Sequence, residues 1–188
     1  MVWISSPGRP AQDDGAVQIR RAVTADAPRI ADLHVRGWQA GYRGLLPQSL
    51  LDALDPAQRV PRWTAAVEEA AWPASGTLVA ENAGDLLGFA DLRPTRDADQ
   101  DPAVVGEITS FYVAPDAWGQ GIGRSLMAAS IQTMSDAGFS AASLWVLDTN
   151  VRAIAFYEAA GWLRDGATKD DVVGGAPIRD LRYRRAIR

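Results

Sequence analysis

The chain has 188 residues, and 47% of them are hydrophobic, which fits one globular domain with a core of its own. The net charge of −4 at pH 7 argues against general binding to nucleic acid or to anionic membranes. The sequence has no cysteine, which excludes disulfides and thiol nucleophiles, and no apolar run of the roughly 18 residues that a membrane span needs. These features predict a cytoplasmic enzyme or binding protein.

The N-terminal part of the chain predicts a tail, a strand and a helix. Residues 1–16 are rich in Pro, Gly, Ser and Asp, which is typical of a flexible tail, and residues 17–188 are expected to form a single domain. Apolar and polar residues alternate over 17–22, which predicts a strand. A helix is expected from Thr24, which offers an N-cap, to about Gly41.

Helices and strands alternate along the rest of the chain, which predicts an α/β fold with a mixed sheet. The expected elements are a short helix within 42–56, a helix over 56–71, a hairpin over 77–94, a strand over 104–113, a helix over 121–137, a strand over 141–147, a helix over 150–161 and a last strand over 178–185. A further strand near Trp162 stays open. Trp145 and Trp162 are interpreted as core residues.

Three glycines alternate where the helix after residue 120 should begin. Gly119, Gly121 and Gly123 are costly there, because glycine in a helix is about 1 kcal/mol less favourable than alanine. The Rossmann pattern G-x-G-x-x-G fails because Arg124 takes the place of the third glycine, and no Gly-Lys pair supports a P-loop. Two interpretations remain: a helix N-terminus that binds a phosphate, and a tight turn with no ligand.

The stretches EITSFYVAPDAWGQGIGRSLM and NVRAIAFYEAAGW together resemble the GCN5-related N-acetyltransferases, the GNAT family. That family places a loop of the form R/Q-x-x-G-x-G/A after a strand and a V-x-P turn. This chain matches the pattern at Val113, Pro115, Gly121 and Gly123. It departs at the first position, where Trp118 replaces Arg or Gln. The departure weakens the match only modestly, because backbone amides are the main ligands of the phosphates.

The resemblance spans about residues 104–163 and implies a particular fold. It implies a mixed, mostly antiparallel sheet of about six to seven strands, with a splayed central parallel pair and about four flanking helices. The strands 104–113 and 141–147 form that pair, with a bulge helping them to separate. The resemblance also implies acetyl-CoA as the acyl donor, with its pantetheine arm in the gap between the two strands.

The resemblance assigns residues to the coenzyme. Unpaired amides at the start of the helix after Gly121 would hold the diphosphate, with the charge of Arg124 nearby, and Asn150 would bind the pantetheine arm or cap the next helix. The implied coenzyme-binding residues are Phe111, Tyr112, Val113, Trp118, Gly119, Gln120, Gly121, Ile122, Gly123, Arg124, Ser125, Asn150 and Phe156.

Transfer of an acetyl group to an amine benefits from a base for the amine and an acid for the departing thiolate. Glu107 is the candidate base, since its neighbours are apolar and regular alternation puts it on the same strand face as Val113, unless a bulge between them shifts the alternation. Apolar neighbours raise the pKa of a carboxyl group. Tyr157 is the candidate acid, at the place of the family's tyrosine. Both residues also have structural interpretations, as a surface charge and as a residue at the edge of the core.

The helix after residue 150 has Val151, Ile154, Ala155 and Ala159 as its expected buried face, with Tyr157 beside that face. By analogy with the family, residues 38–47 cover the acceptor side, and Trp38, Tyr42 and Arg43 are candidates to line it. Aromatic rings suit an apolar or cationic group and Arg43 suits a carboxylate, although packing between helices explains the same residues.

His34 is the only histidine, and a structural role is the favoured interpretation. The sequence has no H-E-x-x-H motif and no cluster of His and carboxylates at metal-ligand spacing, so no metal is expected.

Two functions stay open from the sequence. The first is an acetyl-CoA-dependent N-acetyltransferase acting on a primary amine of a small molecule or on a protein N-terminus. The second is a coenzyme-A-binding sensor or assembly module without turnover. Both need the glycine loop, but only the enzyme needs Glu107 and Tyr157. A homodimer is possible by analogy with the family.

Overall fold

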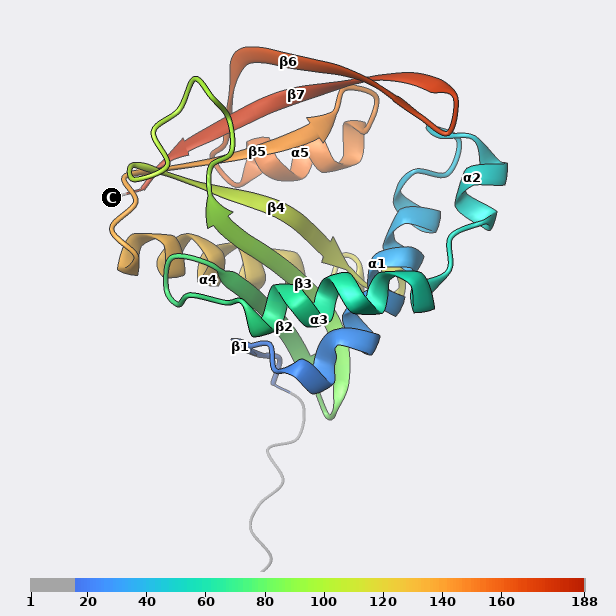
Figure 1. Ribbon diagram of the computed structural model, residues 1–188, viewed down its shortest axis with the longest axis horizontal. Coiled ribbons are helices and arrows are strands. Elements are labelled where there is room, and N and C mark those ends of the chain that lie inside the picture. The colour runs from blue at the N-terminus through green and yellow to red at the C-terminus, as the bar shows by residue number, and fades with distance from the viewer. Residues whose placement is uncertain (1–15, 188) are drawn as a thin grey trace, which may run out of the picture.

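The computed structural model describes residues 16–187, so the predicted flexible tail lies almost entirely outside the described residues. The chain forms a seven-stranded sheet in the order β1-β2-β3-β4-β5-β7-β6 (Figure 1). The strands are β1 (Gln18–Arg21), β2 (Gly76–Asn82), β3 (Asp85–Pro94), β4 (Val105–Val113), β5 (Ala141–Leu147), β6 (Leu163–Val173) and β7 (Ala176–Ala186). The helices are α1 (Ala27–Gly41), α2 (Gln48–Asp52), α3 (Val60–Glu68), α4 (Ile122–Asp136) and α5 (Val151–Ala159).

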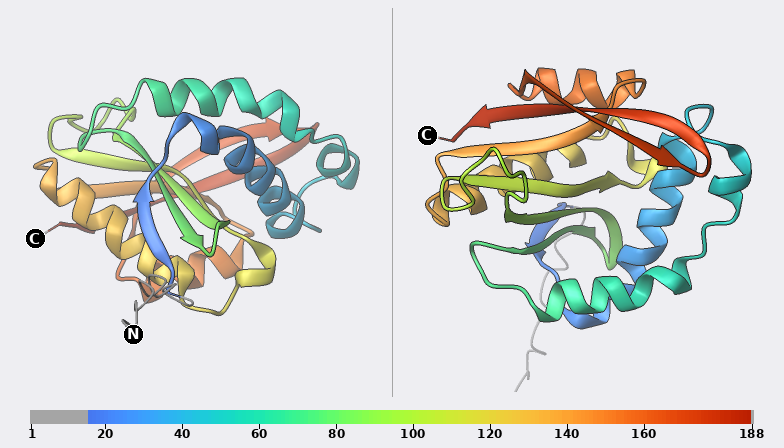
Figure 2. Two further views of the ribbon diagram at one scale, coloured as in Figure 1. Left: turned by 90° about the horizontal axis from the view of Figure 1, so that it is seen from below. Right: turned by 45° about the horizontal axis from the view of Figure 1, so that its top comes forward.

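Helices cover both faces of the sheet, which the left view of Figure 2 shows along the sheet edge. On one face, α1 and α3 contribute Ile30, Leu33 and Trp63 to a buried cluster with β2 and β3. On the other face, α4 contributes Leu126 and Met134 to a second cluster that also includes α5. The short α2 lies at one end of the sheet (Figure 1). This arrangement confirms the predicted α/β fold with four helices flanking the sheet.

The only parallel neighbours among the described strands, β4 and β5, separate partway along their length. Their Cα pairing stops at Ile108 and Leu144, although β4 continues to Val113 and β5 to Leu147. At the same point the register of β4 against β3 shifts between Ile108 and Ser110. A bulge of this kind bends the strand and redirects its side chains. The splayed parallel pair that the resemblance implied is therefore confirmed.

The strand near Trp162 that the sequence left open exists and is long. β6 runs from Leu163 to Val173 at the edge of the sheet and pairs only with β7. Nearly all of its side chains are exposed, so it has no alternation of apolar and polar residues to indicate a strand. β7 is also longer than predicted, because its first residues pair with the exposed end of β6.

Two expectations about burial are wrong. On α5, Val151 is 75% exposed, and Ala155 and Ala159 are exposed as well, whereas Tyr157 is buried. The reason is that the helix packs on the sheet through the side that carries Tyr157 and its neighbours one turn away, so apolar composition alone misplaces the buried face. Trp145 is only half-buried, because no helix covers its side of β5, while Trp162 is fully buried as predicted.

Ionic contacts hold the loop between β3 and β4 over that side of β5 and β7. Arg182 of β7 donates to Asp97 at 3.2 Å and to Asp99 at 2.7 Å. Asp97 also accepts from Lys169 of β6 at 2.7 Å and from the Trp145 indole at 3.0 Å. Asp97 and Arg182 are buried, and each is paired with opposite charges, which is the condition under which a protein tolerates buried charges.

Candidate active site

The glycine loop opens α4 with a backbone that only glycine adopts easily. Gly119 and Gly121 have φ values of 80° and 86°, in the left-handed region, and Gly121 is the N-cap of α4. A Cβ atom added at either glycine would meet nothing within 4 Å, so space is open above the loop. An open loop at a helix N-terminus is a suitable place for a phosphate group. The observed geometry therefore fits the diphosphate of coenzyme A.

The remaining loop residues differ in what they offer. Gln120, Arg124 and Ser125 are exposed, so their side chains are available to a ligand. Gln120 already donates to the Asp116 carbonyl at 3.0 Å. Ile122 is 3% exposed and packs into the core, so its backbone, and not its side chain, is the part that can contact a coenzyme.

Side chains of β4 and α5 line the gap beside the loop. Phe111 stacks on Phe156 with 5.6 Å between ring centroids. The Phe156 ring also lies 3.3 Å from the position of a Cβ at Gly123, next to Val113. Asn150 caps α5 by accepting from the Ala153 amide at 3.1 Å, which confirms the capping interpretation. The structure thus brings the glycine loop and the motif on α5 together at the point where β4 and β5 separate.

Tyr157 lies at the inner end of this gap. Its side chain is 8% exposed and contacts Phe111, Phe156 and Trp162 through edge-on ring contacts. Burial, and to a smaller extent the nearby Tyr42, raises the pKa of Tyr157 above its usual value. The phenol therefore keeps its proton at neutral pH, which a proton donor requires.

An aromatic cluster occupies the opposite side of the sheet, under α1. His34 lies 4.9 Å from Tyr112 between ring centroids and accepts a hydrogen bond from the Trp63 indole at 3.2 Å. Burial, with Arg59 and Arg62 nearby, lowers the pKa of His34 to about 3, so it is neutral. The structural interpretation of His34 is supported. The Tyr112 side chain is part of this cluster and therefore points away from Phe111 and α5.

The predicted acceptor residues are split between this cluster and the surface. Trp38 and Tyr42 are in edge-on contact at 5.1 Å, and the buried indole nitrogen of Trp38 has no hydrogen-bond partner within residues 16–187. Burial raises the pKa values of Tyr42 and Tyr112, so both hydroxyls stay protonated. Arg43 lies apart from them on the surface.

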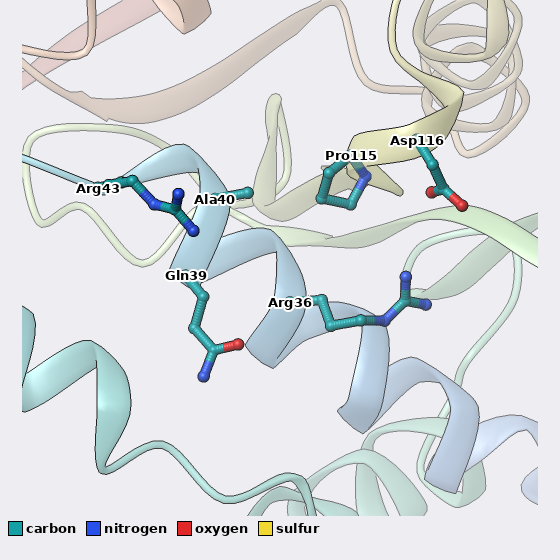
Figure 3. Close-up of a pocket in the computed structure, with 6 residues that line it drawn as sticks. All are labelled: Arg36, Gln39, Ala40, Arg43, Pro115 and Asp116. Carbon is teal, nitrogen blue, oxygen red and sulfur yellow. The ribbon is translucent and has the colours of Figure 1, made fainter.

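Arg43 lines an open pocket of about 330 Å³ between the end of α1 and the segment after β4 (Figure 3). Arg36, Gln39 and Ala40 come from the same helix, and Pro115 and Asp116 lie across from them. Arg36 already pairs with Asp32 at 2.7 Å, whereas Arg43 has no ion pair with any residue between 16 and 187. The pocket thus has one free guanidinium group.

Glu107 is buried in β4, 4% exposed, but its surroundings are not those expected. The bulge after Ile108 breaks the alternation, so Glu107 does not share a face with Val113; it lies on the α1 side. Its neighbourhood is also charged and not apolar, because Arg96 donates to its carboxylate from the main-chain amide at 3.3 Å and from the side chain at 3.3 Å. The sequence pattern could not reveal either feature, since both depend on contacts with β3 and the loop after it.

Asp180 is a carboxylate that the sequence did not single out. It is half-buried on β7, between Leu147 of β5 and Lys169 of β6 in register, with no hydrogen bond from any described residue. Its neighbours Leu181 and Tyr183 pack on the α5 side, so alternation places Asp180 on the α1 side. Burial raises the pKa of Asp180, with Asp171 and Asp148 adding to the effect.

Residues 16–187 include neither a metal site nor a membrane-spanning helix. They contain no group of three or more His, Cys, Asp or Glu side chains arranged to hold a metal ion. No helix in the same range has both the length and the apolar character needed to cross a bilayer.

The chain is similar in sequence and fold to known proteins. The family model "Acetyltransferase (GNAT) family" matches residues 45–162. The "Uncharacterized N-acetyltransferase YuaI" of Bacillus subtilis is 29% identical over 144 residues, covering 76% of this chain and 78% of that protein. The mycothiol acetyltransferase of Sanguibacter keddieii is 38% identical over 100 residues, 53% of this chain but only 32% of that protein.

A solved structure shares the fold along most of the chain. The ribosomal-protein-alanine N-acetyltransferase of Brucella melitensis superposes with a TM-score of 0.69 and 26% identity, covering 90% of this chain and 99% of that one. The family-model match, over residues 45–162, spans both the glycine loop and the helix that carries Tyr157. The chain therefore belongs to the GNAT family of N-acetyltransferases, enzymes whose acyl donor is acetyl-CoA.

Proposed function

We propose that this enzyme transfers the acetyl group of acetyl-CoA to a primary amine by direct attack on the thioester, with Tyr157 as general acid and Glu107 as general base. The observation that carries the proposal is the position of Tyr157. It lies where β4 and β5 stop pairing, on the helix that packs against the glycine loop. A coenzyme held by the loop amides and entering this gap brings its sulfur toward that ring.

The proposed reaction transfers two protons, one to the departing thiolate and one from the attacking amine. The amine nitrogen forms a bond to the acetyl carbon, the bond from that carbon to sulfur breaks, and the thiolate takes the Tyr157 hydroxyl proton. A tyrosine with its ordinary pKa of about 10 is protonated at neutral pH, and burial raises the pKa of Tyr157 further, so the donor is in the correct form before the reaction begins. The amine loses its proton to Glu107, which is on the α1 side of the sheet with the predicted acceptor residues.

The acceptor enters, in this proposal, from the α1 side. Trp38, Tyr42 and Tyr112 supply aromatic surface there, and the free guanidinium of Arg43 suits a carboxylate at the edge. The two similar proteins with informative names act on different kinds of acceptor, since one is a mycothiol acetyltransferase and the other acetylates the alanine of a ribosomal protein. We therefore keep two acceptor classes, a small-molecule amine and a protein N-terminus.

A turnover screen tests the proposal. Purified full-length protein is mixed with acetyl-CoA and a panel of amines that includes amino acids, polyamines, amino sugars and short peptides with free N-termini, and release of free thiol is followed. We expect acetylation of at least one amine, with the N-acetyl product identified by mass spectrometry. Coenzyme binding without acetylation of any amine or peptide would favour the silent binding module instead.

Glu107→Gln is expected to lower kcat at neutral pH while leaving the Kd of acetyl-CoA unchanged, because glutamine keeps the shape but cannot accept a proton. General-base catalysis contributes about 10²-fold or more. The measurement is kcat across pH 6 to 9 with an amine found in the screen, together with calorimetry of coenzyme binding. Glutamine also weakens the contact with Arg96, so the unfolding midpoint of the variant is measured alongside.

Asp180→Asn is the matched comparison for this experiment, since it removes a half-buried carboxylate on the same side of the sheet as Glu107. Loss of kcat in Glu107→Gln with a normal Asp180→Asn supports Glu107 as the base. The reverse pattern transfers the role to Asp180. A large loss of coenzyme affinity in Glu107→Gln instead makes Glu107 a structural residue.

A further inference from the structure

Arg152 of α5 lies over the ring of Trp118, the first residue of the glycine loop motif. Its guanidinium carbon is 3.6 Å from the centre of the ring, the shortest such contact between a cation and an aromatic ring in residues 16–187. The two residues come from motifs that are well separated in the sequence. The contact therefore joins the two sides of the gap between the loop and α5.

Trp118 is a fixed platform for this contact. Its indole N–H donates to the Val113 carbonyl at 2.9 Å, which ties the ring to the end of β4. A guanidinium group stacked on an aromatic face keeps its N–H donors free in its own plane, so stacking orients the group without using its hydrogen bonds. An ammonium group on a flexible lysine chain lacks this property.

No acidic side chain within the described residues neutralises the charge of Arg152. Its side chain is exposed, and within residues 16–187 it forms neither an ion pair nor a hydrogen bond to an acidic group. One helical turn further along α5, Phe156 lies against Gly123 of the loop, so this side of α5 faces the start of α4. An unpaired guanidinium is thus held at the rim of the open space above Gly119 and Gly121.

We propose that Arg152, held on the Trp118 ring, binds the diphosphate of coenzyme A and supplies the charge that this loop lacks at its first position. The pattern of the family has Arg or Gln where this chain has Trp118. Here the tryptophan makes no phosphate contact itself but positions an arginine from α5. The inference rests on the proposed reaction only in its use of coenzyme A, and not on the acceptor, Glu107 or Tyr157.

The test is calorimetry of coenzyme A binding to full-length protein. Arg152→Gln should raise the Kd of coenzyme A by about tenfold to a hundredfold, the range for losing a hydrogen bond between charged groups. Arg152→Lys should recover only part of the loss, and Trp118→Leu should weaken binding as well. In the double variant the two losses should be less than additive, because the second change removes a support that no longer has a function.

Arg21→Gln is the matched control. Arg21 also lies over a tryptophan, 4.8 Å from the Trp72 ring, but on β1, at an edge of the sheet away from the glycine loop. The Kd of coenzyme A for Arg21→Gln should equal that for the parent protein. A Kd for Arg152→Gln within twofold of the parent value overturns the proposal, provided that the unfolding midpoint shows a folded variant. Since Arg152 is exposed, that midpoint should hardly change.

A second ligand identifies which phosphate is bound. 3′-Dephospho-coenzyme A keeps the diphosphate and lacks the 3′-phosphate, so Arg152→Gln should lose the same factor with it. A loss that disappears with this ligand assigns Arg152 to the 3′-phosphate and overturns the diphosphate assignment. Because both ligands are measured without an amine, a failure of the proposed acid, base or acceptor leaves this result unaffected.

Discussion

Tyr157→Phe is expected to acetylate the preferred amine about a hundredfold more slowly than the parent enzyme, the usual loss for a general acid. Phenylalanine keeps the ring contacts with Phe111, Phe156 and Trp162, so packing in the gap is retained. What is removed is the hydroxyl group, which is protonated at neutral pH and is the proposed proton donor. The measurement is kcat at saturating amine and acetyl-CoA, with KM and the Kd of coenzyme A determined in parallel.

Tyr42→Phe is the control for this variant. It also removes a hydroxyl whose pKa is raised by burial, but from the α1 side of the sheet. We expect its effect to fall on the KM of the amine more than on kcat. Parental kcat in Tyr157→Phe would remove Tyr157 from the mechanism, and a large rise in the Kd of coenzyme A at unchanged kcat would make it a binding residue.

Asp97→Ala is expected to lower the free energy of unfolding by about 3 kcal/mol, because removing one member of a buried ionic group leaves its partners less well compensated. Arg182, whose side chain is 7% exposed, loses one of its three carboxylate partners, and Lys169 loses its own. The Trp145 indole loses its acceptor as well. The loop between β3 and β4 is the part expected to loosen first.

Denaturant titration of parent and variant measures this effect. Asp170→Ala is the control, because its pair with Arg179 is exposed on both sides, and an exposed pair contributes about 0 to 1 kcal/mol. A loss in Asp97→Ala no larger than in Asp170→Ala would show that the ionic group does not stabilise the fold.

The pH dependence of the free energy of unfolding is a second test of the role of Asp97. Burial alone raises the pKa of this carboxyl, but hydrogen bonds from Lys169 and Arg182 outweigh burial and bring it below its ordinary value. A carboxyl with a lowered folded-state pKa contributes stability above its unfolded pKa, about 3.9, and that contribution is lost as the pH falls through the folded value. The difference in stability between parent and Asp97→Ala should therefore shrink in acid and stay constant above about pH 5.

The structure also decides how the loop motif should be understood. From the sequence, Trp118 is a mismatch at a position where the family has Arg or Gln. In the fold, the Trp118 ring carries Arg152, and the indole is tied to β4 by a hydrogen bond. The residue that departs from the family pattern thus contacts an arginine from another motif. A local sequence pattern cannot describe such a contact between distant residues.

The sequence by itself determined most of the elements and the glycine loop that is proposed to hold the coenzyme. Period and turn residues indicate most strands and helices, because a half-buried strand or helix must alternate its side chains between core and water. β6 was left open because an edge strand with nearly all its side chains exposed has no such alternation. The glycines at 119 and 121 and the cap at Asn150 act within a few residues, so their effect can be read locally.

Only the tertiary structure decided which side chains meet at the site. The bulge after Ile108 put Glu107 on the α1 side, and the contact from Arg96 gave it a charged neighbour. Asp180 became a candidate only when β7 was inserted between β5 and β6, and Arg182 reached Asp97 across 85 residues of chain. Strand register and pairing bring such groups together, and both are set by the packing of the whole sheet, which local sequence does not specify.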